Sequence, residues 1–187
     1  LGEGGERFTR RADVSAYLPF SLHPLLRDDG RLGIIITNAW LGTDWVDDFY
    51  SLLGRYYDLK CVITSGAGRW FQNSEVVTNI LILDKKADPS TPSGNVKYVV
   101  LTRPLEELAD EEAVEISAAQ IELGQTQNDT MTIREVSHAD LARYRQFGLG
   151  GNAQFVDCDW VLDVPLSPLT DHFAIRRGER RGMNALF

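Results

Sequence analysis

Two large aromatic side chains, Trp70 and Phe71, interrupt a polar, glycine-flanked stretch just before an apolar run, in the sequence RWFQNSEVVTNILILDKK of residues 69–86. A loop is ordinarily solvated, so this much hydrophobic surface needs a physical reason. One reason is packing, because burying an aromatic side chain removes roughly 150–250 Å² from water. The other is chemistry, because an aromatic face can stack on a flat ligand. These residues alone leave both interpretations open.

Asn38 is a second candidate ligand group, because it ends the apolar, β-branched run RLGIIITN of residues 31–38. Ligand sites of open α/β sheets cluster at the carboxyl ends of strands. Asn38 could therefore line a pocket, or it could simply cap the strand and order the following turn. Trp40 is interpreted as core packing.

An arginine cluster near the end of the chain is the third candidate. Guanidinium groups suit the oxygens of phosphates and the edges of guanine, and Gly178 and Gly182 would allow the backbone to approach a phosphate closely. The alternative is a solvated basic run on the surface. The cluster consists of Arg176, Arg177, Arg180 and Arg181.

Recognised catalytic motifs are absent from the 187 residues. There is no Walker loop, HExxH, GxSxG or strand-linked GxGxxG, and the glycines of LGEGGE at the start follow no predicted strand. Cys61 and Cys158 stand far apart without CxxC spacing, which predicts buried free thiols, and the three histidines do not cluster. We therefore predict no catalytic residue and no metal site from these patterns.

The elements that would position these side chains follow an α/β rhythm. A helix bent by Pro19 and Pro24 precedes a strand that is predicted to be buried on both faces, as in a parallel sheet. Thr43 is predicted to cap an amphipathic helix whose apolar stripe runs from Trp45 to Tyr56. Beyond residue 102 the pattern changes, and it predicts an acidic helix, a strand, a short helix and a flexible break at GLGGN. The remaining predicted strands are residues 59–65, 76–86 and 95–101.

Bulk composition is that of a globular protein, with 43% hydrophobic and 25% charged residues. The net charge of −8 argues only weakly against nucleic acid, because a local basic patch can persist in an acidic chain. No apolar run approaches the roughly 20 residues that span a bilayer. We expect a cytoplasmic protein with no membrane contact.

The order of segments resembles a known family. RRADVSAYLPFSLHPLLRDDGRLGIIITNAWLGTDWVDDFYSLL followed by LKCVITSGAGRWFQNSEVVTNILILDKK is similar to the later half of the catalytic domain of gamma-type N6-adenine DNA methyltransferases of restriction–modification and phage-defence systems, including Type IIG and BREX-like proteins. FAIRRGERRGMNALF resembles the signature that opens their target-recognition region. This implies part of a Rossmann-like methyltransferase sheet over residues 1–102, followed by a smaller α+β segment over residues 103–187.

The resemblance also implies roles for the candidate residues. Adenine must be turned out of the duplex to be methylated. Phe71 and Trp70 are both assigned to the pocket for this base: Phe71 matches the position whose ring stacks on the base, and the structural interpretation is favoured for Trp70. Asn73 could hydrogen-bond a base edge, or it could only satisfy backbone groups. Asn38 would line the same pocket. The predicted DNA contacts are Arg69, Arg176, Arg177, Arg180, Arg181 and Asn184.

The implied function is that of a piece of a DNA adenine-N6 methyltransferase. Its partners would be double-stranded DNA and the remainder of the methyltransferase domain, and its sheet, cut at one edge, could self-associate. The family's loop for S-adenosylmethionine and its Asn/Asp-Pro-Pro-aromatic motif are not in these residues, so the chain is expected to be inactive alone. The alternatives are a non-catalytic DNA-binding or interaction module of a defence complex, and a methyltransferase acting on protein or RNA.

Overall fold

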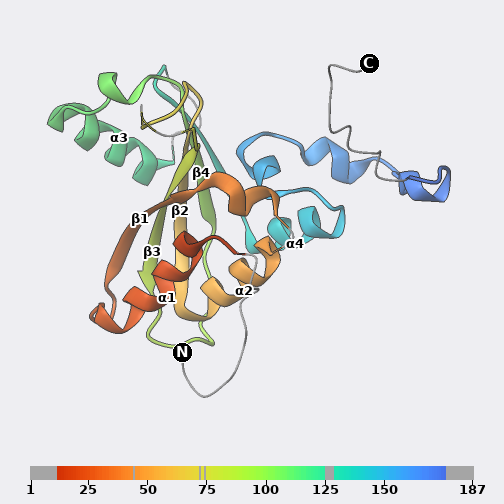
Figure 1. Ribbon diagram of the computed structural model, residues 1–187, viewed down its shortest axis with the longest axis horizontal. Helices are drawn as coiled ribbons and strands as arrows, with labels where there is room; N and C mark the ends of the chain where they lie inside the picture. Colours follow the sequence, from red (N-terminus) through yellow and green to blue (C-terminus); the bar gives the residue numbers. More distant parts are fainter. Residues whose placement is uncertain (1–11, 44, 72, 74, 125–128, 176–187) are drawn as a thin grey trace, which may run out of the picture.

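The molecule is built around one sheet of five strands, seen in a computed structural model that describes residues 12–43, 45–71, 73, 75–124 and 129–175. The strands lie in the order β1-β3-β2-β4-β5, and helices lie on both faces of the sheet (Figure 1). The α/β class predicted from the sequence is therefore confirmed. The strands are β1 (Arg31–Thr37), β2 (Tyr57–Ser65), β3 (Thr78–Lys85), β4 (Val96–Leu101) and β5 (Met131–Val136).

The sheet is mixed. β3 lies between β1 and β2 and runs antiparallel to both, whereas β2 and β4 are parallel, and β5 is antiparallel to β4. The prediction that β1 is buried on both faces, as in a parallel sheet, is wrong, because β1 is paired only with the antiparallel β3 among the described residues and Ile35 is 48% exposed. Because β5 pairs with β4, the sheet includes strands from both of the segments predicted from the sequence.

A bent helical segment precedes β1, as predicted. It consists of the 3-10 turn η1 (Val14–Tyr17), the short helix α1 (Leu18–Leu22) and the turn η2 (His23–Leu25). Pro19 and Pro24 each stand at the start of one of these pieces, where the missing backbone donor costs no helical hydrogen bond. The chain can therefore turn twice over the sheet within twelve residues.

Helix α2 (Val46–Tyr56) covers the same face as α1 and confirms the amphipathic stripe, with Phe49 and Leu53 fully buried. The predicted Thr43 cap is wrong. The chain passes first through the turn η3 (Asn38–Gly42), and the residue at the N-cap position of α2 is Trp45, whose side chain does not cap the helix. The Thr43 hydroxyl has no hydrogen-bond partner among the described residues, and it is the Thr43 carbonyl that accepts from the Val46 N–H (3.2 Å).

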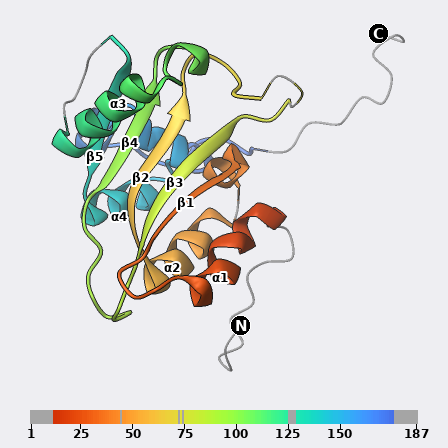
Figure 2. The same cartoon turned by 90° about the vertical axis from the view of Figure 1, so that its left-hand side faces the viewer.

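Helix α3 (Glu111–Leu123) lies on the opposite face. Its start is capped by the Asp110 carboxylate, which accepts from the Ala113 N–H (2.9 Å), and it ends at Gly124 in the left-handed conformation (φ 67°). A small core of six buried residues lies on this face near β4 and β5, with Ile121 of α3 packed against it. Figure 2 shows α3 over this part of the sheet, beside an uncovered stretch of β1, β3 and β2.

The chain after β5 returns to the first face. Helix α4 (His138–Gln146) is capped by Ser137 and followed by the 3-10 turns η5 (Gly151–Phe155), η6 (Asp159–Asp163) and η7 (Leu169–Asp171). The prediction of a flexible break at GLGGN is wrong at its second half. Gly151 is buried against Leu41, and a Cβ there would lie 2.9 Å from the Leu41 carbonyl oxygen. Gly151 therefore serves close packing.

None of the helices among the described residues is both long enough and apolar enough to cross a membrane.

Candidate functional site

The segments that carry the predicted ligand-binding residues lie at one end of the sheet. Registers Thr37↔Thr78 and Ser65↔Leu101 place the carboxyl ends of β1, β2 and β4 at the same edge. Asn38 follows β1 directly, and the loop of residues 66–77 joins β2 to β3 at this edge. The structure thus brings Asn38 and the loop that carries Trp70, Phe71 and Asn73 together, as expected for strand ends in an α/β sheet.

Two hydrogen bonds fix the turn after β1 to the start of β3. The Asn38 N–H donates to the Val77 carbonyl oxygen (2.9 Å), and the Trp40 indole Nε1–H donates to Asn79 Oδ1 (3.0 Å). Trp40 and Asn79 are fully buried, and the Asn79 Nδ2 has no hydrogen-bond partner among the described residues. Because a buried indole N–H ordinarily needs an acceptor, Asn79 holds Trp40, and through it η3, in place beside the loop.

The carboxyl end of β1 is held by hydrogen bonds to Asp13. Its Oδ2 accepts from the Thr37 hydroxyl (2.9 Å), and its Oδ1 accepts from the Ser15 N–H (3.0 Å). These hydrogen bonds, with the Ser15 N–H contributing most, lower the pKa of the Asp13 carboxyl below its ordinary value. The carboxylate therefore ties η1 to the last residue of β1, directly before Asn38.

The two aromatics of the loop have different surroundings. Trp70 is half-buried and packs against the small core on the α3 face, whose buried members include Cys61 and Leu101. Phe71 is 46% exposed, so its ring is available to a ligand. Arg69 and Asn73 are exposed on the same loop. The packed Trp70 agrees with its structural interpretation, whereas base stacking by Phe71 stays a prediction.

The buried thiol and hydroxyl groups of the sheet and of α2 are not poised for nucleophilic chemistry. Burial raises the pKa of the Cys61 thiol to about 12, which keeps it protonated. The Tyr50 and Tyr98 hydroxyls share a buried hydrogen bond of 2.7 Å, and burial raises both of their pKa values. Cys61 is buried and free as predicted, while Cys158 is free but only half-buried. Within the described residues no group of three His, Cys, Asp or Glu could hold a metal ion.

An open cleft of about 350 Å³ lies at the other end of β1. It is lined by Arg27, Asp29, Arg31, Asp84 and Lys85. The Arg31 Nε–H donates to Asp84 Oδ1 (2.6 Å), and this ion pair neutralises much of the local charge. Since Arg31 and Thr37 are the two ends of the same strand, the cleft is remote from Asn38 and the loop.

The predicted DNA-contacting residues Arg176, Arg177, Arg180, Arg181 and Asn184 lie outside the described residues.

Sequence reasoning missed Asn79. A single amide within the apolar run VVTNILIL was an available signal, because a polar side chain at a core position needs a partner. What the sequence could not supply was the partner, Trp40, which lies 39 positions earlier.

The architecture defines a class of fold: an α/β sheet in which the antiparallel strand β3 lies between β1 and β2, whose carboxyl ends lie at the same end of the sheet. The structure of the type IIG restriction endonuclease BpuSI is similar, with a TM-score of 0.57 and 14% sequence identity. The likeness covers 76% of this chain and 16% of that chain, so this chain spans only a small part of that protein. At this identity the two share the fold.

Two type I restriction–modification structures are more distant. One is a modification subunit of a putative type I restriction enzyme from Vibrio vulnificus, with a TM-score of 0.46, 15% identity, and coverage of 64% of this chain and 27% of that chain. The other is a chain of a type I restriction–modification system, with a TM-score of 0.44, 16% identity, and coverage of 78% and 32%. No protein-family model and no curated protein matches the sequence.

Proposed function

We propose that this chain is the downstream part of the catalytic domain of a site-specific DNA adenine-N6 methyltransferase of a restriction–modification or phage-defence system. In this role it supplies one wall of the target-base pocket and leads into the DNA-recognition region. The observation that carries the proposal is the placement of two residues at the same end of the sheet. Phe71 is exposed on the loop of residues 66–77, which packs on the small core through Trp70, and Asn38 directly follows β1.

The chemistry explains why such a ring is needed. The N6 amino group of adenine cannot be reached inside a duplex, so the base has to be turned out and held in a pocket. Stacking on an aromatic side chain contributes about 1–3 kcal/mol per base. Phe71 offers the stacking face, and the amides of Asn73 and Asn38 can donate and accept hydrogen bonds at a base edge.

The cofactor of such an enzyme is S-adenosylmethionine, which supplies the methyl group. The glycine loop and the Asn/Asp-Pro-Pro-aromatic motif that would bind it and direct the transfer do not occur in these 187 residues. The residues of this chain therefore bind and orient the base in our proposal, and the chain alone is expected to transfer no methyl group.

The outer edge of β1 supports the proposal that the sheet continues in the rest of the domain. Hydrogen bonds from the Lys85 N–H to the Gly30 oxygen (2.8 Å) and from the Asn38 N–H to Val77 set the alternation along the β1–β3 ladder. Every second residue of β1 then directs its backbone groups away from β3. The outward backbone groups, which pair with no other strand within the described part of the chain, belong to Arg31, Gly33, Ile35 and Thr37.

The proposal is tested with Phe71→Ala in the complete parent protein. Loss of stacking should lower methyl transfer to DNA roughly 5- to 150-fold, the equivalent of about 1–3 kcal/mol. It should also reduce the fluorescence change of 2-aminopurine placed at the target base. Phe147→Ala is the matched control, because Phe147 is 44% exposed and follows α4, outside the loop of residues 66–77.

Unchanged turnover together with an unchanged fluorescence signal in Phe71→Ala would contradict the stacking role. The isolated chain, assayed with methyl-labelled S-adenosylmethionine and DNA, should show no transfer, and detectable transfer would contradict the assignment to a partial domain. A parent protein that binds DNA but never methylates it would favour the non-catalytic alternative.

A further inference from the structure

Exposed hydrophobic side chains concentrate in residues 156–175, which we call the acidic arm. Seven large apolar residues of this segment are exposed, as many as in the whole stretch of residues 12–101. Every residue from Asp163 to Ile175 is exposed. Six of the apolar side chains are more than half exposed: Val156, Trp160, Leu166, Leu169, Phe173 and Ile175.

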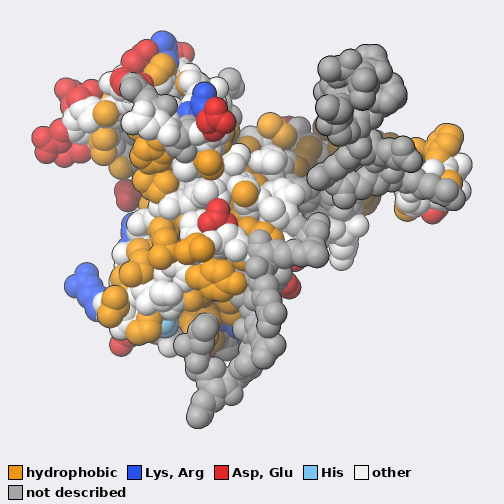
Figure 3. Space-filling view, in the orientation of Figure 1, with side chains coloured by type: hydrophobic (Ala, Val, Ile, Leu, Met, Phe, Trp, Pro, Cys, Tyr) orange, Lys and Arg blue, Asp and Glu red, His pale blue; other side chains and the backbone are white. Residues whose placement is uncertain are grey.

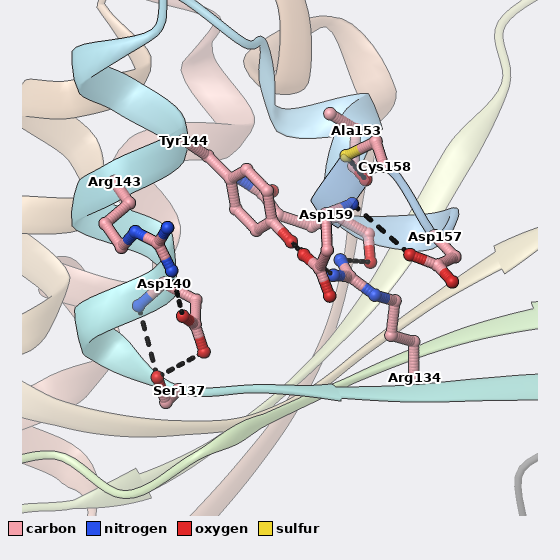
Figure 4. A network of polar contacts seen from close by, with 10 residues as sticks. Arg134, Ser137, Asp140, Arg143, Tyr144, Ala153, Asp157, Cys158 and Asp159 are labelled. Carbon is pink, nitrogen blue, oxygen red and sulfur yellow. Dashed lines mark hydrogen bonds and ion pairs between the residues drawn. The ribbon is translucent and has the colours of Figure 1, made fainter. Parts of the chain in front are cut away.

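The base of the acidic arm is fixed to the body. Phe155 packs edge-to-face on the buried Tyr98, with ring centroids 5.1 Å apart. A guanidinium N–H of Arg134 donates to Asp159 Oδ1 (2.8 Å), and the Tyr144 hydroxyl contacts both groups (Figure 4). The arm therefore leaves the side of α4 from an ordered anchor and extends away from the sheet (Figure 1).

Beyond the anchor, the arm is shaped by its own local hydrogen bonds. The Phe173 N–H donates to the Leu169 carbonyl oxygen (2.9 Å), and the Ser167 hydroxyl lies 2.8 Å from His172 Nε2. Figure 3 shows hydrophobic side chains at the outer end of this segment. Exposed apolar side chains at this density along one short segment mark a binding site, and the local hydrogen bonds reduce the entropic cost of docking.

The charge of the arm identifies the chemistry of its partner. Residues 156–175 contain four aspartates and no Lys or Arg. The wider stretch of residues 103–175 carries four arginines and fourteen acidic residues, a formal net charge of −10, which exceeds the −8 of the whole chain. Such a surface repels the phosphates of DNA and the anionic face of a bilayer. A second copy of this acidic chain is disfavoured for the same reason.

We propose that the acidic arm docks on another protein, in an apolar groove bordered by Lys and Arg. The six exposed apolar side chains fill the groove, and Asp157, Asp163 and Asp171, which lie outside the anchor of Asp159 and Arg134, meet the basic rim. Aromatic and aliphatic anchors at the centre with charges at the border form the usual anatomy of a protein–protein interface. The described part of residues 103–175 thus serves protein assembly, and does not itself contact DNA.

The test uses the full chain and a defined probe, an amphipathic helical peptide of Leu and Lys. Binding should bury Trp160 and shift the emission to shorter wavelength, because Trp160 is 68% exposed, whereas Trp40 and Trp45 are buried and Trp70 is half-buried against the small core on the α3 face. Trp160→Phe should abolish the shift. A Leu and Glu peptide with the same apolar face should bind about tenfold more weakly or worse. A short DNA duplex should produce no shift.

Variants locate the binding. L166S/L169S should lower the affinity for the Leu and Lys peptide by about tenfold or more. V14S/L25S, which alters two exposed residues outside the arm, should leave this affinity unchanged. The triple variant D157N/D163N/D171N should bring the affinity for the two peptides close together. Equal binding by L166S/L169S and the unaltered chain, a Trp160 shift with DNA, or a concentration-dependent shift without peptide that signals self-association would each overturn the proposal.

Discussion

The two faces of the sheet differ in how completely they are covered. One face is sealed by α1, α2, η3, α4 and η5, and its core contains twenty buried residues. The other is covered by α3 beside β4 and β5, and its core contains six. Over β1, β3 and β2 this second face leaves Ile35 exposed and Ile63, Ile80 and Ile82 half-buried.

The difference shows which part of the molecule is self-sufficient. The first face carries the folding stability of the chain, because hydrophobic stabilisation scales with the apolar area that is removed from water. The uncovered part of the second face adjoins the edge of β1 that pairs with no other strand among the described residues. An apolar face and a free strand edge are the features that a continuing sheet, as we propose for the parent protein, would cover. The well-covered first face and the poorly covered second face therefore both include β1, the edge strand of the sheet.

The sharpest test of this comparison pairs Phe49 with Ile35. Phe49 is fully buried on the first face, so Phe49→Ala should lower the free energy of unfolding by about 3–5 kcal/mol. Ile35 is 48% exposed on the second face, and Ile35→Ala should lower it by less than about 1 kcal/mol. Urea unfolding followed by circular dichroism measures both. Losses of equal size would show that the second face is buried in solution.

A smaller effect is expected at the contact between η5 and η3, which closes the first face. In Gly151→Ala the new Cβ would lie 2.9 Å from the carbonyl oxygen and 3.0 Å from the Cα of Leu41, so the backbone would have to shift. The free energy of unfolding should fall by about 1–3 kcal/mol. Gly42→Ala is the control, because a Cβ there meets nothing within 4 Å. Equal thermal stability of the two variants would refute the close-packing role of Gly151.

Local patterns predicted the elements well and their arrangement less well. The stripe from Trp45 to Tyr56 and the prolines at 19 and 24 gave the helices of the first face, because both signals act within one or two turns. The place of β3 between β1 and β2 was not predicted, since strand order depends on contacts between distant residues. The same limit explains the error at GLGGN, where packing against Leu41 overrides the flexibility that glycines confer on an isolated segment.

The candidate site divides in the same way. The strand-end rule placed Asn38 at a ligand-binding end of the sheet, and the family resemblance placed Phe71 in the same pocket. The structure puts Asn38 and the loop of residues 66–77 at the same end of the sheet, and their role in a pocket stays a prediction. The buried pair of Trp40 and Asn79 could not be predicted, because neither residue indicates its partner. The uneven distribution of charge, by contrast, was readable from the sequence, but its meaning depended on seeing that the acidic arm is exposed.

The smallest effect concerns the anchor that holds the end of η5 and the start of η6 on the first face. Hydrogen bonds from Tyr144 first, and then from Arg134, lower the pKa of the Asp159 carboxyl below its ordinary value near 3.9. A lowered pKa in the folded state means that the carboxylate stabilises the protein above that ordinary value, and that this stability is lost as the pH falls through the folded-state pKa. Asp159 is 61% exposed, so solvent screening limits the contribution to about 1 kcal/mol or less.

Asp159→Asn should therefore lower stability slightly at neutral pH and flatten the acid limb of the unfolding free energy below about pH 4. Asp163→Asn, at an exposed position four residues further on, is the matched control and should keep the acid limb of the unaltered chain. Chemical unfolding at a series of pH values measures both. If the two variants show the same acid limb, the Asp159 carboxylate does not hold the arm to the body, and the first face is closed by apolar packing alone.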